Sequence, residues 1–192
     1  MDYACTLVEE IVTRLARKIR REREGRGWSL AMLARRAGVS TSMISKIERG
    51  EASPTAVLLG RLSAAFGMTI SALLEEERRR ADRLLRRADQ AVWEDPATGY
   101  VRRSVCPPGA GRIEIVEVTL PGGAKVAFPR DAYAFIDQQI WMRRGVLHFR
   151  EGDTVHVLRS GDHLTLGPAA DCVFENCGRS ECVYAVMVTR NR

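Results

Sequence analysis

The side chains best suited to recognising another molecule are concentrated in one short segment, residues 40–49. The segment carries hydroxyl, thioether and cationic groups on Ser40, Thr41, Ser42, Met43, Ser45, Lys46 and Arg49. Hydroxyl groups hydrogen-bond base edges or phosphate oxygens, lysine reaches a guanine or a phosphate, and methionine contacts a thymine methyl group. We expect a helix cap or phosphate contact from Ser40, and a phosphate contact or local salt bridge from Arg49. This chemistry suits double-stranded DNA, and the alternative is a solvated helix surface.

The distribution of charge over the 192 residues also favours a polyanionic partner. The formal net charge is +6, and residues 1–90 hold 18 basic against 12 acidic side chains, whereas residues 91–192 hold 12 of each. Between Arg14 and Arg49 the excess rises to +8. A basic first half joined to a neutral second half indicates a polyanion-binding module attached to a part with another role.

Helical periodicity before residue 75 and strand-like runs after residue 92 predict an α + β chain of two domains. Helices are predicted over residues 9–24, 29–37, 40–49, 54–66 and 72–74. The later apolar runs are short and separated by Gly- and Pro-rich turns, which is typical of a β-sandwich or small barrel. We therefore predict a five-helix domain over residues 1–74, a helical linker over residues 75–92 and an all-β domain over residues 93–192.

Residues 30–49 have the spacing that a helix-turn-helix requires. Ala34 is small enough for two helices to cross closely, and Gly38 accepts the positive φ of the turn between them. Four apolar residues are placed to hold both helices on the core: Leu33, Val39, Ile44 and Ile47. The second helix should then lie in the major groove with its first residues on base edges.

This segment resembles the Xre/Cro/C1-type helix-turn-helix domain over residues 8–74. The resemblance rests on Gly38-Val39-Ser40, Ile44-Ser45, Ile47-Glu48-Arg49-Gly50 and Pro54-Thr55. It implies a five-helix, λ-repressor-like fold and sequence-specific DNA binding. Leu30 stands where the family often has a phosphate-contacting glutamine. We expect Ser29 to take over that contact and Glu48 to hold the turn that follows it.

The second half resembles the small cupin barrel, or jelly roll, of Xre-cupin regulators over residues 105–188. The matching residues are Pro121-Gly122-Gly123, Trp141–Gly145, Gly161-Asp162, Pro168 and Phe174-Glu175-Asn176. Many cupins bind a divalent metal through three histidines and a glutamate. Here those four positions fall on Ala132, Ala134, Gln138 and Cys172. Because this set cannot hold a divalent metal, we expect no metal, no cofactor and no catalytic residue.

We therefore predict that the β domain pairs two subunits and senses a small-molecule effector. Its candidate pocket residues are Tyr133, Phe135, Gln138, Trp141 and Cys172. A small barrel has room for one small ligand. Two sharper alternatives stay open, a non-standard metal site from His148, His156 and His163, and a thiol sensor at Cys177.

The whole sequence predicts a cytoplasmic, homodimeric transcriptional regulator that binds a roughly palindromic operator. It has an odd number of cysteines, five, no recognisable secretion signal and no apolar run long enough for a membrane span. Two other readings remain, a cupin enzyme with a DNA-binding appendage and an antitoxin-like module that binds proteins. Stoichiometric metal would favour the first, and protein capture without DNA binding would favour the second.

Overall fold

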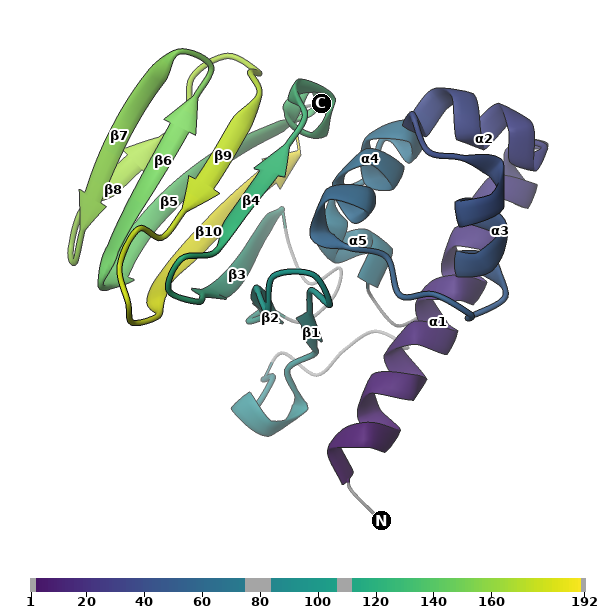
Figure 1. Ribbon diagram of the computed structural model, residues 1–192, viewed down its shortest axis with the longest axis horizontal. Helices are drawn as coiled ribbons and strands as arrows, with labels where there is room; N and C mark the ends of the chain where they lie inside the picture. Colours follow the sequence, from purple (N-terminus) through teal and green to yellow (C-terminus); the bar gives the residue numbers. More distant parts are fainter. Residues whose placement is uncertain (1–2, 75–83, 107–111, 191–192) are drawn as a thin grey trace.

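The computed structural model describes residues 3–74, 84–106 and 112–190, with side chains of the first helix described from Val12 onward. Five α-helices come first, followed by sheets and two 3-10 turns (Figure 1). The helices are α1 (Tyr3–Gly25), α2 (Leu30–Ala37), α3 (Thr41–Glu48), α4 (Ala56–Phe66) and α5 (Ile70–Leu74). The five-helix prediction is confirmed, and α1 extends beyond the expected start at residue 9.

Local signals set the helix ends. The hydroxyls of Ser29, Ser40 and Thr55 accept hydrogen bonds from backbone N–H groups in the first turns of α2, α3 and α4. Gly38 follows α2 with a φ of 61° and Gly67 follows α4 with a φ of 66°, a conformation that glycine adopts at little cost. These caps fix α2 and α3 as two short helices joined by a tight turn.

The second half folds into two antiparallel sheets that pack face to face. The strands are β1 (Val92–Glu94), β2 (Val101–Ser104), β3 (Ile113–Leu120), β4 (Lys125–Phe128), β5 (Ile136–Arg144), β6 (Val146–Glu151), β7 (Thr154–Arg159), β8 (His163–Thr165), β9 (Cys172–Glu175) and β10 (Cys182–Arg190). One sheet has the order β1-β2-β3-β10-β5-β8 and the other β4-β9-β6-β7. The prediction of an all-β second domain is confirmed.

Aromatic rings fill the space between the two sheets. Phe174 stacks on Tyr184 with ring centroids 5.7 Å apart and contacts Phe149 at 4.8 Å. Phe128 meets Phe174 edge-on at 5.9 Å. Such ring pairs add stability beyond their buried area. The aromatic cluster therefore joins the four-stranded sheet to β10 of the six-stranded sheet.

The linker prediction differs from the structure over the residues that are described. Residues 75–83 of the predicted helix lie outside the described residues, and residues 84–86 have no regular structure. Arg87–Asp89 forms a single 3-10 turn, η1, and Val92 already belongs to β1. Leu84 is the one large apolar side chain in this stretch with an exposure above one half, at 64%. Because residues 84–92 lack an apolar stripe, a helix over them would have little apolar surface to pack on the β domain.

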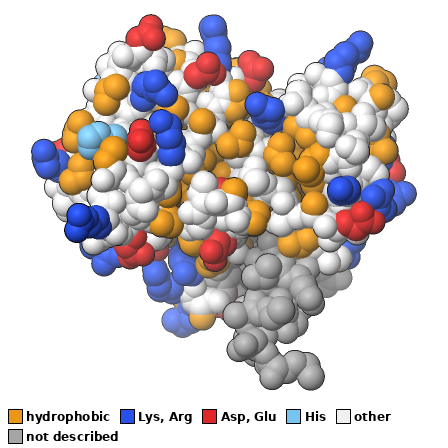
Figure 2. All heavy atoms as spheres, viewed as in Figure 1, with side chains coloured by type: hydrophobic (Ala, Val, Ile, Leu, Met, Phe, Trp, Pro, Cys, Tyr) orange, Lys and Arg blue, Asp and Glu red, His pale blue; other side chains and the backbone are white. Residues whose placement is uncertain are grey.

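The helical and β domains share one continuous core. Helix α4 packs against β4 and against η2 (Arg130–Tyr133), and Figure 1 shows α4 and α5 facing the sheets. A Cβ atom on Gly60 would lie 2.8 Å from the ring of Phe128, so this close approach requires glycine. Figure 2 shows a notch between the two lobes with hydrophobic side chains gathered beside it. Among the described residues, no helix is long and apolar enough to cross a membrane.

Asp95 ties the two domains together by capping α4 from the β domain. Its Oδ1 atom accepts a hydrogen bond from Ala56 N at 3.2 Å, and its Oδ2 atom accepts one from the Thr98 hydroxyl at 2.6 Å. The residue is 2% exposed. A buried carboxylate at a helix N-terminus satisfies a free N–H group and matches the positive end of the helix dipole.

Replacing Asp95 by alanine should lower the free energy of unfolding by about 1–3 kcal/mol, because buried N–H and hydroxyl groups lose their acceptor. Urea unfolding followed by circular dichroism measures the change. Asp153→Ala is the matched control, since Asp153 is exposed in the turn between β6 and β7. Equal midpoints for the two variants would contradict the capping role.

Candidate nucleic-acid interface

Helix α3 presents its polar residues outward because its apolar residues are buried. Ile44 and Ile47 are at most 1% exposed and lie in the core with Leu33 of α2. The predicted contact residues that remain exposed are Ser29, Ser40, Thr41, Ser42, Lys46 and Arg49, while Met43 and Ser45 are half-buried. In Figure 1, α2 and α3 lie on the side of the helical domain away from the sheets. A duplex can therefore approach α3 unobstructed by the β domain.

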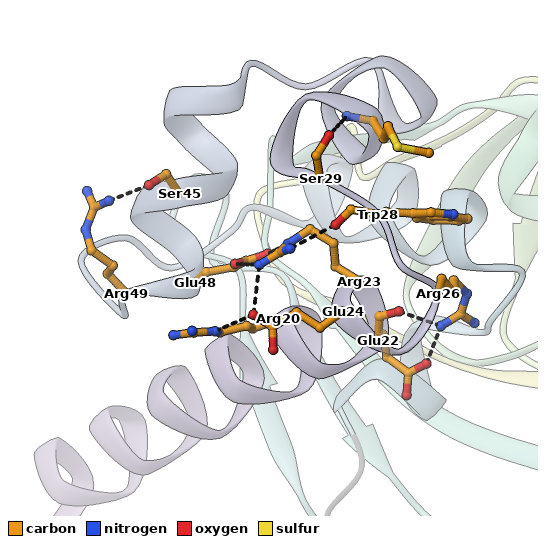
Figure 3. Close-up of polar contacts among 11 residues, drawn as sticks. Arg20, Glu22, Arg23, Glu24, Arg26, Trp28, Ser29, Ser45, Glu48 and Arg49 are labelled. Atoms are coloured by element: carbon orange, nitrogen blue, oxygen red, sulfur yellow. Dashed lines mark hydrogen bonds and ion pairs between the residues drawn. The ribbon is translucent and has the colours of Figure 1, made fainter.

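Two serines of the predicted set are engaged as helix caps. Ser29 Oγ accepts a hydrogen bond from Met32 N at 3.1 Å (Figure 3). Ser40 Oγ accepts one from Met43 N at 3.3 Å and lies 3.2 Å from Ser42 Oγ. Each cap places a hydroxyl and free backbone N–H groups at a helix N-terminus, an arrangement that suits a phosphate. Leu30, at the position often held by glutamine, packs against the core instead.

Arg49 forms the local salt bridge that was one of its two expected roles. Its Nε and Nη2 atoms donate to the two carboxylate oxygens of Glu51 at 2.6 and 2.8 Å, and Nη1 donates to Ser45 Oγ. Hydrogen bonding from Arg49 lowers the pKa of Glu51 below its ordinary value. The cation of Arg49 is thus partly neutralised by a direct ion pair, and Lys46 lies exposed on the same helix, close enough to help lower the pKa of Glu51.

Glu48 braces α3 against α1, which differs from the expected contact with the following turn. Its two carboxylate oxygens accept from Nε and Nη2 of Arg23 at 2.7 and 2.8 Å (Figure 3). Arg23 also donates to the carbonyl oxygen of Trp28 at 2.9 Å. The side chains of Arg23 and Glu48 are 12% and 7% exposed. Hydrogen bonding to Glu48 raises the pKa of Arg23 above its ordinary value, so Arg23 stays a cation.

A stack of rings and guanidinium groups fixes the loop before α2. Trp28 lies parallel to Phe66 at 5.9 Å, and the guanidinium of Arg36 lies 4.4 Å from the Trp28 ring. Arg26 lies over both rings and donates to the carbonyl oxygen of Phe66 at 3.0 Å. Arg61 of α4 donates to the carbonyl oxygen of Gly38 in the turn at 3.0 Å. These contacts hold the loop before α2 and the turn before α3, and so support the position of α3.

A second candidate site is a cavity between the β domain and α5. It encloses about 530 Å³ of empty space, mouth included. The helical domain supplies Ser63, Thr69, Ile70 and Ser71, and the β domain supplies Tyr100, Arg102, Glu114, Phe128, Ala132, Tyr133, Ile136, Gln138, Phe174, Tyr184, Val186 and Val188. Most of these lining side chains are apolar or aromatic, with a few polar groups among them, which is typical of small-molecule sites.

Three of the five predicted pocket residues border this cavity or its neighbour. Tyr133 and Gln138 line it, and both also line an adjoining cavity of about 280 Å³ together with Cys172. Trp141 and Phe135 line neither of these two cavities. On β5 the even-numbered residues face the core, which leaves Trp141 46% exposed and beside Arg143. Phe135 lies between η2 and β5 and is half-buried.

The residues at the cupin metal positions do not suit a divalent metal. Ala132 and Ala134 have no donor atom, and Gln138 offers only an amide. Burial raises the pKa of the Cys172 thiol to about 12, so this group is a protonated thiol at neutral pH, and it is the single sulfur donor of the four positions. Within the part of the chain that the structure describes, no three His, Cys, Asp or Glu side chains are grouped to hold a metal.

Cysteine reactivity should differ sharply along the β domain. Burial raises the pKa of Cys182 to about 11, and a thiol with that pKa is ionised in about one molecule in a thousand at pH 8. Cys177 is exposed in the turn before β10. With iodoacetamide at pH 8, we expect Cys177 to be alkylated at least about tenfold faster than Cys172 and Cys182 in the native protein. Peptide mass spectrometry measures the three rates, and equal rates before unfolding would contradict the burial of the two thiols.

Comparison with known proteins finds a family match that is confined to the helical domain. The profile of the helix-turn-helix family HTH_3 matches residues 19–73. The chain is 34% identical over 67 residues to the HTH-type transcriptional regulator SutR of Escherichia coli K12, across 35% of this chain and 38% of SutR. It is also 34% identical over 64 residues to the HTH-type transcriptional regulator SinR of Bacillus subtilis, across 33% of this chain and 58% of SinR. The chain thus matches less than two thirds of the length of either relative.

A solved structure shares the arrangement of both domains. The HTH_3 family transcriptional regulator from Vibrio cholerae superimposes with a TM-score of 0.77, covering 96% of this chain and 99% of that chain. The two sequences are 22% identical, so the likeness establishes a common fold. It extends over helices and sheets alike.

Proposed function

Because residues 19–73 form a helix-turn-helix domain of the Xre type, we propose that this chain is a sequence-specific, DNA-binding transcriptional regulator. The observation that carries the proposal is the polar, outward face of α3 on a braced helix-turn-helix. Thr41, Ser42 and Lys46 are exposed there, while Ile44 and Ile47 hold the helix on the core. Helix α3 enters the major groove, and its hydroxyls and Lys46 contact base edges and phosphates.

The regulator acts as a homodimer on a roughly palindromic operator. One α3 covers only a short half-site, so a second copy one helical turn away, about 34 Å, supplies the remaining specificity. The β domain provides the pairing of subunits, and the basic excess of residues 1–90 supplies phosphate contacts. The four described cysteines are all unpaired, which suits the reducing cytoplasm where the regulator meets DNA.

The cavity between the domains is where an effector acts. It is lined by residues of α4, α5 and the six-stranded sheet, so a bound molecule contacts both domains at once. An effector that prefers one arrangement of the domains shifts the spacing of the two α3 helices in the dimer. The β domain thereby serves as a sensor, and DNA binding is its output.

Selection of genomic DNA fragments with the purified full chain at near-physiological salt tests the DNA-binding proposal. We expect one enriched motif with two-fold symmetry and a half-site spacing near one helical turn. Diffuse binding that disappears with added salt and shows no motif would overturn it. Analytical ultracentrifugation of the same sample tests the oligomeric state, and a monomer at micromolar concentration would overturn the dimer.

A further inference from the structure

We propose that the cavity between α5 and the six-stranded sheet binds a small monocarboxylate with an apolar body, and that its carboxylate group engages Arg102. This inference rests on the proposed function only for its consequence, the change in DNA affinity. The binding site itself follows from the side chains that line the cavity and from the contacts that they make.

Arg102 is the positive group of the cavity, and its described partners are neutral. Its Nη1 atom donates to the hydroxyl of Tyr100 at 3.1 Å, and its Nη2 atom donates to the hydroxyl of Ser71 at 3.2 Å. A guanidinium forms stronger, paired hydrogen bonds with a carboxylate than with two hydroxyls. Arg102 is half-buried beside the cavity, so a carboxylate entering it reaches this cation without crossing the core.

Tyr184 offers a second polar group, which has no partner of its own. Its side chain is 1% exposed, and among the described residues its hydroxyl has no hydrogen-bond partner. Burial holds the pKa of this phenol well above its ordinary value, so the group is a donor at neutral pH. Leaving such a hydroxyl unpaired is costly, and an acceptor oxygen in the cavity removes that cost.

The other lining residues determine which kind of ligand body fits the cavity, and most of them are apolar. Rings and aliphatic side chains form most of the wall, from Phe128, Tyr133, Phe174, Val186 and Val188 among others. Glu114 lines the same cavity on β3, four residues from Val118, which is the register partner of Arg102. Four strand residues separate the two backbone positions by about 13 Å along the strand. The lining therefore favours a ligand with an apolar body and one carboxylate for Arg102.

Arg102 also connects the cavity to the DNA-binding domain. Its bond to Ser71 joins β2 to α5, and Ser71 is 5% exposed. A bound carboxylate competes for the same guanidinium, which weakens this link between the domains. The helical domain then gains freedom relative to the sheets, and the dimer holds its two α3 helices less firmly at the operator spacing. By reciprocity, operator DNA lowers the affinity for the carboxylate.

Calorimetric titration of the full chain with benzoate and with 4-methylvalerate tests the site without DNA. Benzamide serves as the neutral counterpart of benzoate. We expect at least one of the two carboxylates to bind once per chain, with at least about tenfold preference for benzoate over benzamide if benzoate binds. Arg102→Met should remove the binding. Arg103→Met is the matched control, because Arg103 lies next along β2 outside the cavity and pairs with Glu117.

Tyr184→Phe separates loss of the site from loss of the fold. Removing an unpaired buried hydroxyl should leave the unfolding midpoint unchanged or higher, while carboxylate affinity falls several-fold. The site is overturned if neither carboxylate binds at 10 mM, if benzamide binds as tightly as benzoate, or if Arg102→Met binds like the native chain. None of these outcomes affects the DNA-binding proposal, since no DNA is present.

Operator affinity in saturating carboxylate tests the coupling. The sodium salt of the carboxylate that binds is compared with sodium chloride at equal ionic strength, because DNA affinity depends on salt. We expect about a tenfold loss of operator affinity for the native chain and none for Arg102→Met. Unchanged affinity at saturation would overturn the coupling while the site stands. A chain that binds the carboxylate but no operator would overturn the proposed function while the site stands.

Discussion

Replacing Ser45 and Lys46 together by alanine should lower the affinity for the selected operator by about 100-fold and leave the fold intact. Each good base contact contributes about 1–3 kcal/mol of discrimination, and a tenfold change in affinity corresponds to about 1.4 kcal/mol. Neither side chain supports the core, since Lys46 is exposed and Ser45 is half-buried beside Arg49. The loss should therefore appear in binding and not in the unfolding midpoint. Fluorescence anisotropy with a labelled operator measures it.

The comparison of specific and non-specific DNA makes this prediction decisive. Affinity for a scrambled duplex should fall much less, because removing one positive charge weakens only the phosphate contacts. Lys125→Ala is the control for charge alone, since Lys125 lies on β4 and pairs with Glu175. If the double variant keeps its preference for the operator, α3 is not the reading helix. If both duplexes lose equally, these two residues contact only phosphates.

The helix-turn-helix could be predicted from the sequence because its determinants are local. A cap such as Ser40 acts on a backbone group three residues away, and Gly38 supplies a backbone conformation that the turn itself requires. The burial of Ile44 and Ile47 follows from helical periodicity. None of these features depends on which distant segment packs against the helix, so the bounds of α3 and its exposed residues could be predicted directly.

The junction cavity could not be predicted in the same way, because strand pairing assembles it. Arg102 and Tyr184 are 82 positions apart and meet through the register of β2, β3 and β10. Side chains alternate between the two faces of β5, with Gln138 facing inward and Trp141 outward. Which of the two faces is buried depends on how β5 pairs with its neighbouring strands, and the sequence of β5 alone does not show this. An arginine in a short strand resembles any surface arginine, so Arg102 carried no signal of its own.

The ion pair between Arg23 and Glu48 could not be predicted from the sequence either, because the two residues are 25 positions apart and lie on different helices. The sequence marked Glu48 as structural, and the structure supplies a different partner. Helix α3 is only eight residues long and makes few intrahelical bonds, so its orientation depends on contacts with its neighbours. Loss of one side chain of this ion pair is therefore expected to affect both stability and DNA binding.

Glu48→Ala should lower the free energy of unfolding by about 2 kcal/mol and weaken operator binding as well. The change leaves the mostly buried cation of Arg23 without its carboxylate, and removing one partner of such a pair costs more than the pair contributes. Arg23→Met in the same chain should recover part of the stability, because no unpaired charge then remains. Urea unfolding of the two single variants and the double variant forms the cycle.

Operator affinity measured on the same variants separates stability from positioning. The double variant should regain stability more than affinity, because methionine and alanine restore no directed bond between α1 and α3. Glu51→Ala is the control, since Glu51 makes an exposed pair with Arg49 and its loss should leave the unfolding midpoint nearly unchanged. If the double variant regains affinity in proportion to stability, the ion pair acts on the fold alone. If Glu48→Ala unfolds like the native chain, the brace contributes nothing, and the orientation of α3 must come from Ile44 and Ile47.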